Sequence, residues 1–122
     1  YIQSKKSYPF FFVKNLPPDA YYRLIGRAAC ALGNSSSFIR EGSYFGTPVV
    51  LVGTRQHNRD RGANILETGE STSEIFKAIN FQLTRGRYPK DMYFGDGTAG
   101  NQIAHILATK TPALQKKFYT LL

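Results

Sequence analysis

The chain has 122 residues, which is enough for one modest domain and too few for two. Its 42% hydrophobic and 14% aromatic content is typical of a folded globular protein, and no apolar run approaches the roughly 20 residues of a membrane-spanning helix. The net charge of +8 points to an anionic partner, which could be nucleic acid, an acidic membrane surface or a phosphorylated small substrate.

The first half of the chain alternates short apolar runs with helix signals. The aromatic and β-branched run at residues 10–13 precedes a pair of prolines and predicts a buried strand. Asp19 can cap the helix that follows the prolines. The next expected elements are a strand at residues 29–32, a helix at 37–45 ended by a left-handed Gly46, a strand at 49–52 and a polar surface loop at 54–62.

The second half continues the same alternation. Residues 63–66 predict a last strand, and Ser-Thr-Ser-Glu at residues 71–74 is a capping box that starts another helix. Asp96 can cap a later helix, which stops before Pro112, and residues 114–122 predict a short terminal helix. The apolar stripe expected on the helix after the capping box is Ile75, Ala78, Ile79 and Leu83.

Short continuous apolar strands that alternate with helices predict an α/β fold. Such strands form a parallel sheet with helices on both faces. Ligands of open parallel sheets bind beyond the carboxyl ends of the strands. Residues 33–37 and 53–55 each follow a predicted strand, so we expect both segments on that ligand-binding rim.

The small-residue turn at residues 33–37 has the chemistry of an anion site. Backbone N–H groups at a helix start are unpaired and carry the positive end of the helix dipole. Three serine hydroxyls add donors, and Arg55 can supply a forked cationic clamp. The residues by themselves also fit a plain strand-to-helix connection in which one serine is the N-cap.

The exact residue sequence of these segments is more informative than any single motif in it. Gly-Asn-Ser-Ser-Ser at 33–37 is followed by Ile-Arg-Glu at 39–41, Gly-Thr-Pro-Val-Val at 46–50 and Gly-Thr-Arg-Gln-x-x-Arg at 53–59. This series, which runs in order from about Val13 to Leu107, resembles the UDP-N-acetylglucosamine 2-epimerases, above all their hydrolysing, sialic-acid-pathway branch. Further matching segments are residues 61–65 and 93–100.

The resemblance implies a GT-B-type fold, with two Rossmann-like domains around a nucleotide sugar. Residues 1–122 would then be the later half of the C-terminal, nucleotide-binding domain of a longer, homo-oligomeric protein. The implied reaction converts UDP-N-acetylglucosamine and water into N-acetylmannosamine and UDP without a cofactor. The family's acid and base residues lie upstream, so we expect no catalytic residue in this chain and no epimerase activity from the chain alone.

The resemblance also assigns binding residues within the chain. It implies that Ser35 and Ser36, with Ser37 as a weaker candidate, contact the UDP phosphates. Glu41 corresponds to the family's ribose-binding glutamate, and a carboxylate suits the two hydroxyl donors of a ribose. Arg55 corresponds to an arginine that contacts UDP.

Other reactive side chains favour ordinary structural roles. Arg59 and Arg61 are expected to be solvated loop charges or salt-bridge partners. His57 and His105 belong to no Ser-His-Asp pattern, and with one cysteine they offer no metal site. Cys30 lies in an apolar run and is expected to be buried and inert, and a lone cysteine fits a reducing, cytoplasmic location.

Three alternatives remain beside a hydrolysing epimerase. A non-hydrolysing epimerase or a GT-B glycosyltransferase would reuse the same diphosphate and ribose contacts. A basic, non-catalytic binding module, with RNA as its partner, would account for the charge alone. However, the basic residues are scattered from Lys5 to Lys117 without a dense block or a nucleic-acid-binding motif, so we expect a nucleotide sugar rather than nucleic acid as the ligand.

Overall fold

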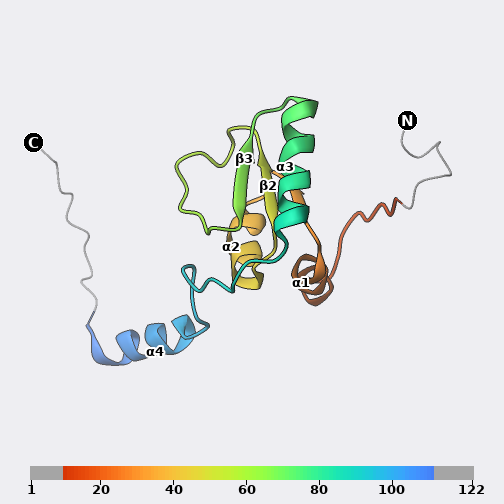
Figure 1. The fold of residues 1–122 in the computed structure, drawn as a ribbon. Helices are drawn as coiled ribbons and strands as arrows, with labels where there is room; N and C mark the ends of the chain where they lie inside the picture. The colour runs from red at the N-terminus through yellow and green to blue at the C-terminus, as the bar shows by residue number, and fades with distance from the viewer. Residues whose placement is uncertain (1–9, 112–122) are drawn as a thin grey trace, which may run out of the picture. The chain divides into compact units, whose positions relative to one another are not determined.

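The computed structural model describes residues 10–111, which form two compact units, one ending at Asp91 and the other beginning at Met92. No helix within residues 10–111 is long and apolar enough to cross a membrane. In chain order, the elements are α1 (Pro18–Arg27), β1 (Ala31–Gly33), α2 (Ser36–Phe45), β2 (Val49–Val52), β3 (Ile65–Thr68), α3 (Thr72–Arg85) and α4 (Ala99–Thr109) (Figure 1).

The three strands form one parallel sheet in the order β1-β2-β3. Leu32 of β1 pairs with Val50 of β2, and Val50 pairs with Leu66 of β3. Because all three strands run in the same direction, their carboxyl ends meet at one edge of the sheet. The predicted parallel sheet is therefore confirmed.

Helices cover both faces of this sheet. On one face, Phe38 and Ile39 of α2 pack against strand side chains. Successive side chains of a strand point to opposite faces, so Val50 faces away from that cluster. Its partner Leu66 lines a groove together with Phe81 of α3, which covers the second face. The expected α/β arrangement is thus observed. The strand residues under α2 are Ala31, Val49, Leu51 and Ile65.

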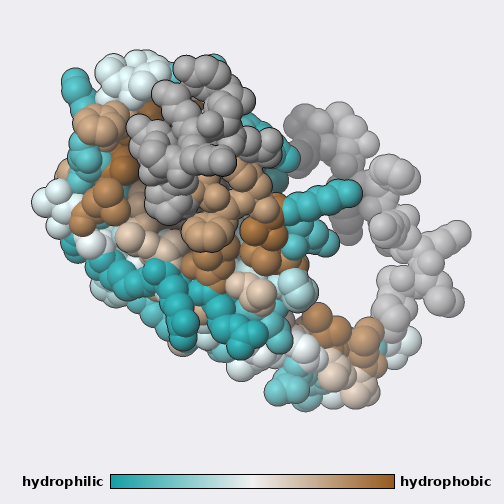
Figure 2. All heavy atoms as spheres, turned by 90° about the vertical axis from the view of Figure 1, so that its right-hand side faces the viewer, coloured by the Kyte–Doolittle hydropathy of each residue, from teal (hydrophilic) through white to brown (hydrophobic). Residues whose placement is uncertain are grey.

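The first helix packs against α2 rather than directly on the sheet. Ile25 is its one buried residue, and the backbone carbonyl of Ile25 accepts a hydrogen bond from Thr47 Oγ1 at 2.7 Å. Leu24, the residue before Ile25 in the same helix, is exposed. Figure 2 shows hydrophobic residues gathered on the side of the molecule that carries α1 and α3. The exposed large hydrophobic residues of these two helices are Tyr22, Leu24, Phe76, Phe81 and Leu83.

Two predicted strands shift and one is wrong. Residues 10–13 form no strand, and Phe11 is 90% exposed. An apolar run becomes a strand only where a neighbouring strand completes its hydrogen bonds, and this run has none among the described residues. The strand predicted at 29–32 begins two residues later, at Ala31, and the strand predicted at 63–66 also begins two residues later, at Ile65. The strand predicted at 49–52 is confirmed.

The helix ends test the predicted caps. Pro17, not Asp19, occupies the N-cap of α1, and Asp19 lies in the first turn. Ser71 is the N-cap of α3, but its Oγ bonds the hydroxyl of Ser73 at 2.9 Å instead of closing a capping box. Gly46 ends α2 with a left-handed φ of 64°, as predicted.

The unit that begins at Met92 contains α4. Asp96 accepts hydrogen bonds from the backbone N–H and the hydroxyl of Thr98, at 2.9 and 2.6 Å, and these bonds lower the pKa of its carboxyl group. Thr98, not Asp96, is the N-cap of α4, so Asp96 stabilises the turn before the helix. The predicted terminal helix at residues 114–122 lies outside the described residues.

Candidate functional site

The turns after β1 and β2 meet at the carboxyl edge of the sheet. Gln56 Nε2 donates to the carbonyl oxygen of Asn34 at 2.8 Å, and Arg55 Nη1 lies 3.5 Å from Asn34 Oδ1. The two segments expected on one rim are therefore in direct contact, although about twenty residues of chain separate them. This contact brings Arg55 to the start of the serine turn.

The serine turn forms the start of α2. Ser35 is the N-cap, and its Oγ accepts from the backbone N–H of Ser37 at 3.3 Å. Ser36 is the first residue of the helix, one residue earlier than predicted. Ser37 Oγ lies 2.9 Å from Ser35 Oγ and also hydrogen-bonds the hydroxyl of Tyr21 on α1. The hydroxyls thus form a short chain at a positive helix end, where an anion is stabilised.

Glu41 lies about one turn further along α2 and lines a pocket of about 630 Å³. Its Oε2 atom is buried and has no hydrogen-bond partner among the residues that the structure describes. Tyr21 lines the same pocket and hydrogen-bonds Ser37, so one side chain joins the pocket to the serine turn. The remaining lining residues are Phe11, Val13, Lys14, Asn15, Leu16, Pro18, Tyr22 and Leu24.

Arg55 is exposed at the rim. Its contact with Asn34 is 3.5 Å long, at the limit of a hydrogen bond, so it holds the guanidinium only loosely. A guanidinium in this state keeps its fork of donors available for an oxyanion.

Gln56 is the residue that sequence reasoning missed. It is 4% exposed, although the loop around it is polar and Arg55 and His57 on either side are exposed. Its burial depends on Asn34, which is far away in the sequence. The one local indication of its importance was its place in the Gly-Thr-Arg-Gln motif.

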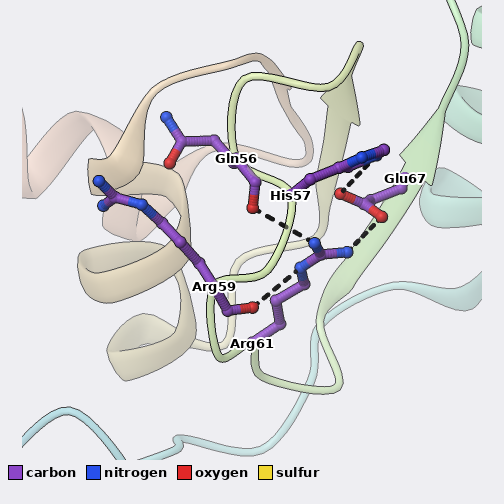
Figure 3. Close-up of polar contacts among 5 residues, drawn as sticks. All are labelled: Gln56, His57, Arg59, Arg61 and Glu67. Atoms are coloured by element: carbon purple, nitrogen blue, oxygen red, sulfur yellow. Dashed lines mark hydrogen bonds and ion pairs between the residues drawn. The ribbon is translucent and has the colours of Figure 1, made fainter. Parts of the chain in front are cut away.

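The rest of this loop is held by Arg61. Its guanidinium pairs with Glu67 of β3 and donates to the carbonyl oxygens of Gln56 at 3.3 Å and Arg59 at 3.2 Å (Figure 3). His57 Nε2 lies 4.0 Å from Glu67 and is half-exposed. Arg61 is therefore a salt-bridge partner and His57 a surface residue, as expected.

Two further reactive side chains, Cys30 and His105, lie outside the serine turn and the Arg55 loop. Burial raises the pKa of the Cys30 thiol, which disfavours the nucleophilic thiolate. His105 is exposed on α4. Within residues 10–111, no group of three or more His, Cys, Asp or Glu side chains could hold a metal ion.

A parallel sheet whose rim carries a serine-capped helix start and an exposed arginine is typical of Rossmann-like nucleotide-binding domains. The chain belongs to the UDP-N-acetylglucosamine 2-epimerase family, whose model matches residues 2–108. Its α/β arrangement agrees with the GT-B-type fold of that family.

Three curated relatives illustrate the range of the family. The chain is 36% identical to a UDP-N-acetylglucosamine 2-epimerase of Neisseria meningitidis serogroup B, over 80% of this chain and 28% of that protein. It is 28% identical to the hydrolysing UDP-N,N'-diacetylbacillosamine 2-epimerase of Legionella pneumophila, over 80% of this chain and 26% of that protein. It is 38% identical to the hydrolysing GDP/UDP-N,N'-diacetylbacillosamine 2-epimerase of Campylobacter jejuni, over 52% of this chain and 17% of that protein. The chain thus spans about a quarter or less of these relatives.

Proposed function

We propose that this chain is the UDP-binding part of a hydrolysing UDP-N-acetylglucosamine 2-epimerase. The whole protein would convert UDP-N-acetylglucosamine and water into N-acetylmannosamine and UDP, for the synthesis of sialic acid or a related nonulosonate sugar. The observation that carries the proposal is the contact between the serine turn and the Arg55 loop, in a chain of this family. The hydrolysing outcome is supported by two relatives whose names include it.

The serine turn and Arg55 are proposed to bind the diphosphate. Ser35, Ser36 and Ser37 combine hydroxyl donors with the positive end of α2, and a diphosphate accepts hydrogen bonds from both. Arg55 adds a charge that is loosely held and exposed at the same rim. This arrangement suits a ligand with two adjacent phosphates better than a neutral sugar.

Glu41 is proposed to bind the ribose. A buried carboxylate oxygen without a partner is costly unless a donor reaches it in the bound state. The two hydroxyls of a ribose are such donors, and the pocket beside Glu41 is adjacent to the serine turn through Tyr21.

In the proposed reaction, UDP leaves C1 of the sugar and the C2 proton is removed, after which water adds to the resulting glycal. The diphosphate gains negative charge as the C1–O bond breaks. Donors fixed at the serine turn, together with Arg55, would stabilise that charge, which is an electrostatic contribution to catalysis. Proton removal at C2 is assigned to other parts of the whole protein, so the 122-residue chain should show no turnover by itself.

The binding proposal is tested by Arg55→Ala in the whole protein. Loss of a charge-assisted hydrogen bond should weaken UDP binding by about 1.5–3 kcal/mol, as measured by calorimetry. Arg23→Ala, which removes an exposed arginine of α1, is the matched control and should bind UDP normally. Unchanged UDP affinity in a folded Arg55→Ala protein would exclude this arginine from the site.

The reaction itself is tested by NMR of the products formed from UDP-N-acetylglucosamine. Free N-acetylmannosamine and UDP are expected. A UDP-linked C2 epimer would assign the protein to the non-hydrolysing branch, and transfer of the sugar to an acceptor would make it a glycosyltransferase.

A further inference from the structure

Gln56 is a buried amide in an exposed loop. Its Nε2 atom donates to the main-chain carbonyl oxygen of Asn34 at 2.8 Å, and this bond crosses from the loop after β2 to the turn after β1. Arg55, the neighbouring residue, makes only the 3.5 Å contact with the side chain of Asn34. The short bond that joins the two turns is therefore the one made by Gln56.

Packing alone does not explain a glutamine at this position. The Oε1 atom of Gln56 is buried without a hydrogen-bond partner in the described part of the chain, and such an atom destabilises a fold. An apolar side chain of the same length would fill the space without that cost. What the glutamine adds is the Nε2 donor to Asn34.

The main chain of Gln56 is anchored on its other side. Its carbonyl oxygen accepts from Arg61 Nη2 at 3.3 Å, and Arg61 pairs with Glu67 of β3. Figure 3 shows the side chain of Gln56 pointing away from the Arg61–Glu67 pair while its carbonyl oxygen points toward it. The loop is thus fixed to β3 by its backbone and to the serine turn by its side chain.

We propose that Gln56 is a positioning residue for the phosphate site, an inference that rests on the proposed UDP-binding function. By holding the carbonyl of Asn34, Gln56 sets the distance between the Arg55 guanidinium and the hydroxyl of Ser35. Because the loop is already fixed before UDP binds, both groups can reach one diphosphate, and binding does not carry the entropic cost of ordering the loop. Gln56 itself contacts no ligand in this role.

The test uses Gln56→Met in the whole protein, because methionine keeps the length of the side chain and lacks the donor. UDP affinity should fall about 3- to 12-fold, the equivalent of one neutral hydrogen bond. Affinity for uridine, which has no phosphate, should stay within 2-fold. The matched control is Gln102→Met, at an exposed glutamine of α4, which should leave both affinities unchanged. A loss of UDP and uridine affinity in equal measure would overturn the positioning role.

A double variant separates this role from a direct one. If Gln56 acts through Arg55, then Arg55→Ala combined with Gln56→Met should bind UDP no more weakly than Arg55→Ala alone. If the losses of UDP affinity caused by the two substitutions multiplied in the double variant, the inference would be overturned, but the proposed UDP site would not. An Arg55→Ala protein with normal UDP affinity would instead overturn the UDP site itself, and the inference with it. If Gln56→Met and Gln56→Leu both failed to fold, the role of Gln56 would be structural.

Discussion

The side-chain amide of Gln82 donates to the main-chain carbonyl oxygen of Val49 at 2.8 Å, from a covering helix to the first residue of the central strand. The same Nε2 atom donates to the carbonyl oxygen of Asn64 at 3.0 Å, and Gln82 Oε1 accepts from the hydroxyl of Tyr88 at 2.8 Å. Gln82 is completely buried. One satisfied amide therefore ties α3 to the amino ends of β2 and β3.

Replacing Gln82 should destabilise the protein strongly. Gln82→Leu puts an apolar side chain in place of the amide and removes its three hydrogen bonds. The buried carbonyl oxygen of Val49 then loses its side-chain donor, and that of Asn64 keeps only the N–H of Val49 at 2.9 Å. We expect the free energy of unfolding to fall by about 2–4 kcal/mol, as measured by urea unfolding. Gln102→Leu, at an exposed position, should change it by less than about 0.5 kcal/mol. Equal small effects of the two substitutions would contradict the role of the amide.

Gly46 occupies a position at which the fold leaves no room for a side chain. Its φ of 64° is left-handed, and a Cβ atom there would lie directly against the carbonyl of Tyr88 and 3.1 Å from the carbonyl oxygen of Pro89. Gly46→Ala should therefore cost more than about 2 kcal/mol of unfolding free energy, from backbone strain and from the displaced carbonyl.

Gly100→Ala is the matched control for Gly46→Ala. Gly100 lies in α4, and a Cβ atom there would meet nothing within 4 Å. Alanine is the better helix former, so the variant should be neutral or more stable by up to about 1 kcal/mol. Thermal unfolding of both variants checks the contrast, and similar shifts in the two Tm values would refute the steric argument at Gly46.

The sequence was sufficient where local chemistry decides the structure. Four consecutive apolar residues, mostly β-branched, fix β2 at Val49–Val52, and the glycine at 46 fixes the end of α2. It was insufficient where distant contacts decide. β3 begins only after Asn64, whose side chain donates to the carbonyl oxygen of Thr47 at 2.8 Å. The aromatic run at 10–13 pairs with no strand within residues 10–111.

The same division applies to the candidate site. Ser35 and Arg55 were expected at one rim because both follow strands of a parallel sheet, and the rim contact is present. The buried Gln56 could not be foreseen, because a glutamine in a polar loop is ordinarily solvated and its partner Asn34 is distant in the sequence. The helix face of α3 was likewise predicted as wholly apolar, whereas the structure buries Gln82 and leaves Leu83 exposed.

The last prediction concerns Glu41, whose buried Oε2 atom has no hydrogen-bond partner within residues 10–111. If the Glu41 carboxylate accepts the ribose hydroxyls, Glu41→Gln should weaken UDP binding about 10-fold or more, because a charged acceptor is replaced by a neutral amide. The 2′,3′-dideoxy analogue of UDP lacks those hydroxyls, so its affinity should be nearly the same for the wild-type and Glu41→Gln proteins. The phosphate contacts proposed for Ser35 and Arg55 would be the same in both proteins and would serve as the internal reference. Calorimetry with the two nucleotides and the two proteins measures the difference directly. Equal weakening of both nucleotides would mean that Glu41 supports the pocket without touching the ribose.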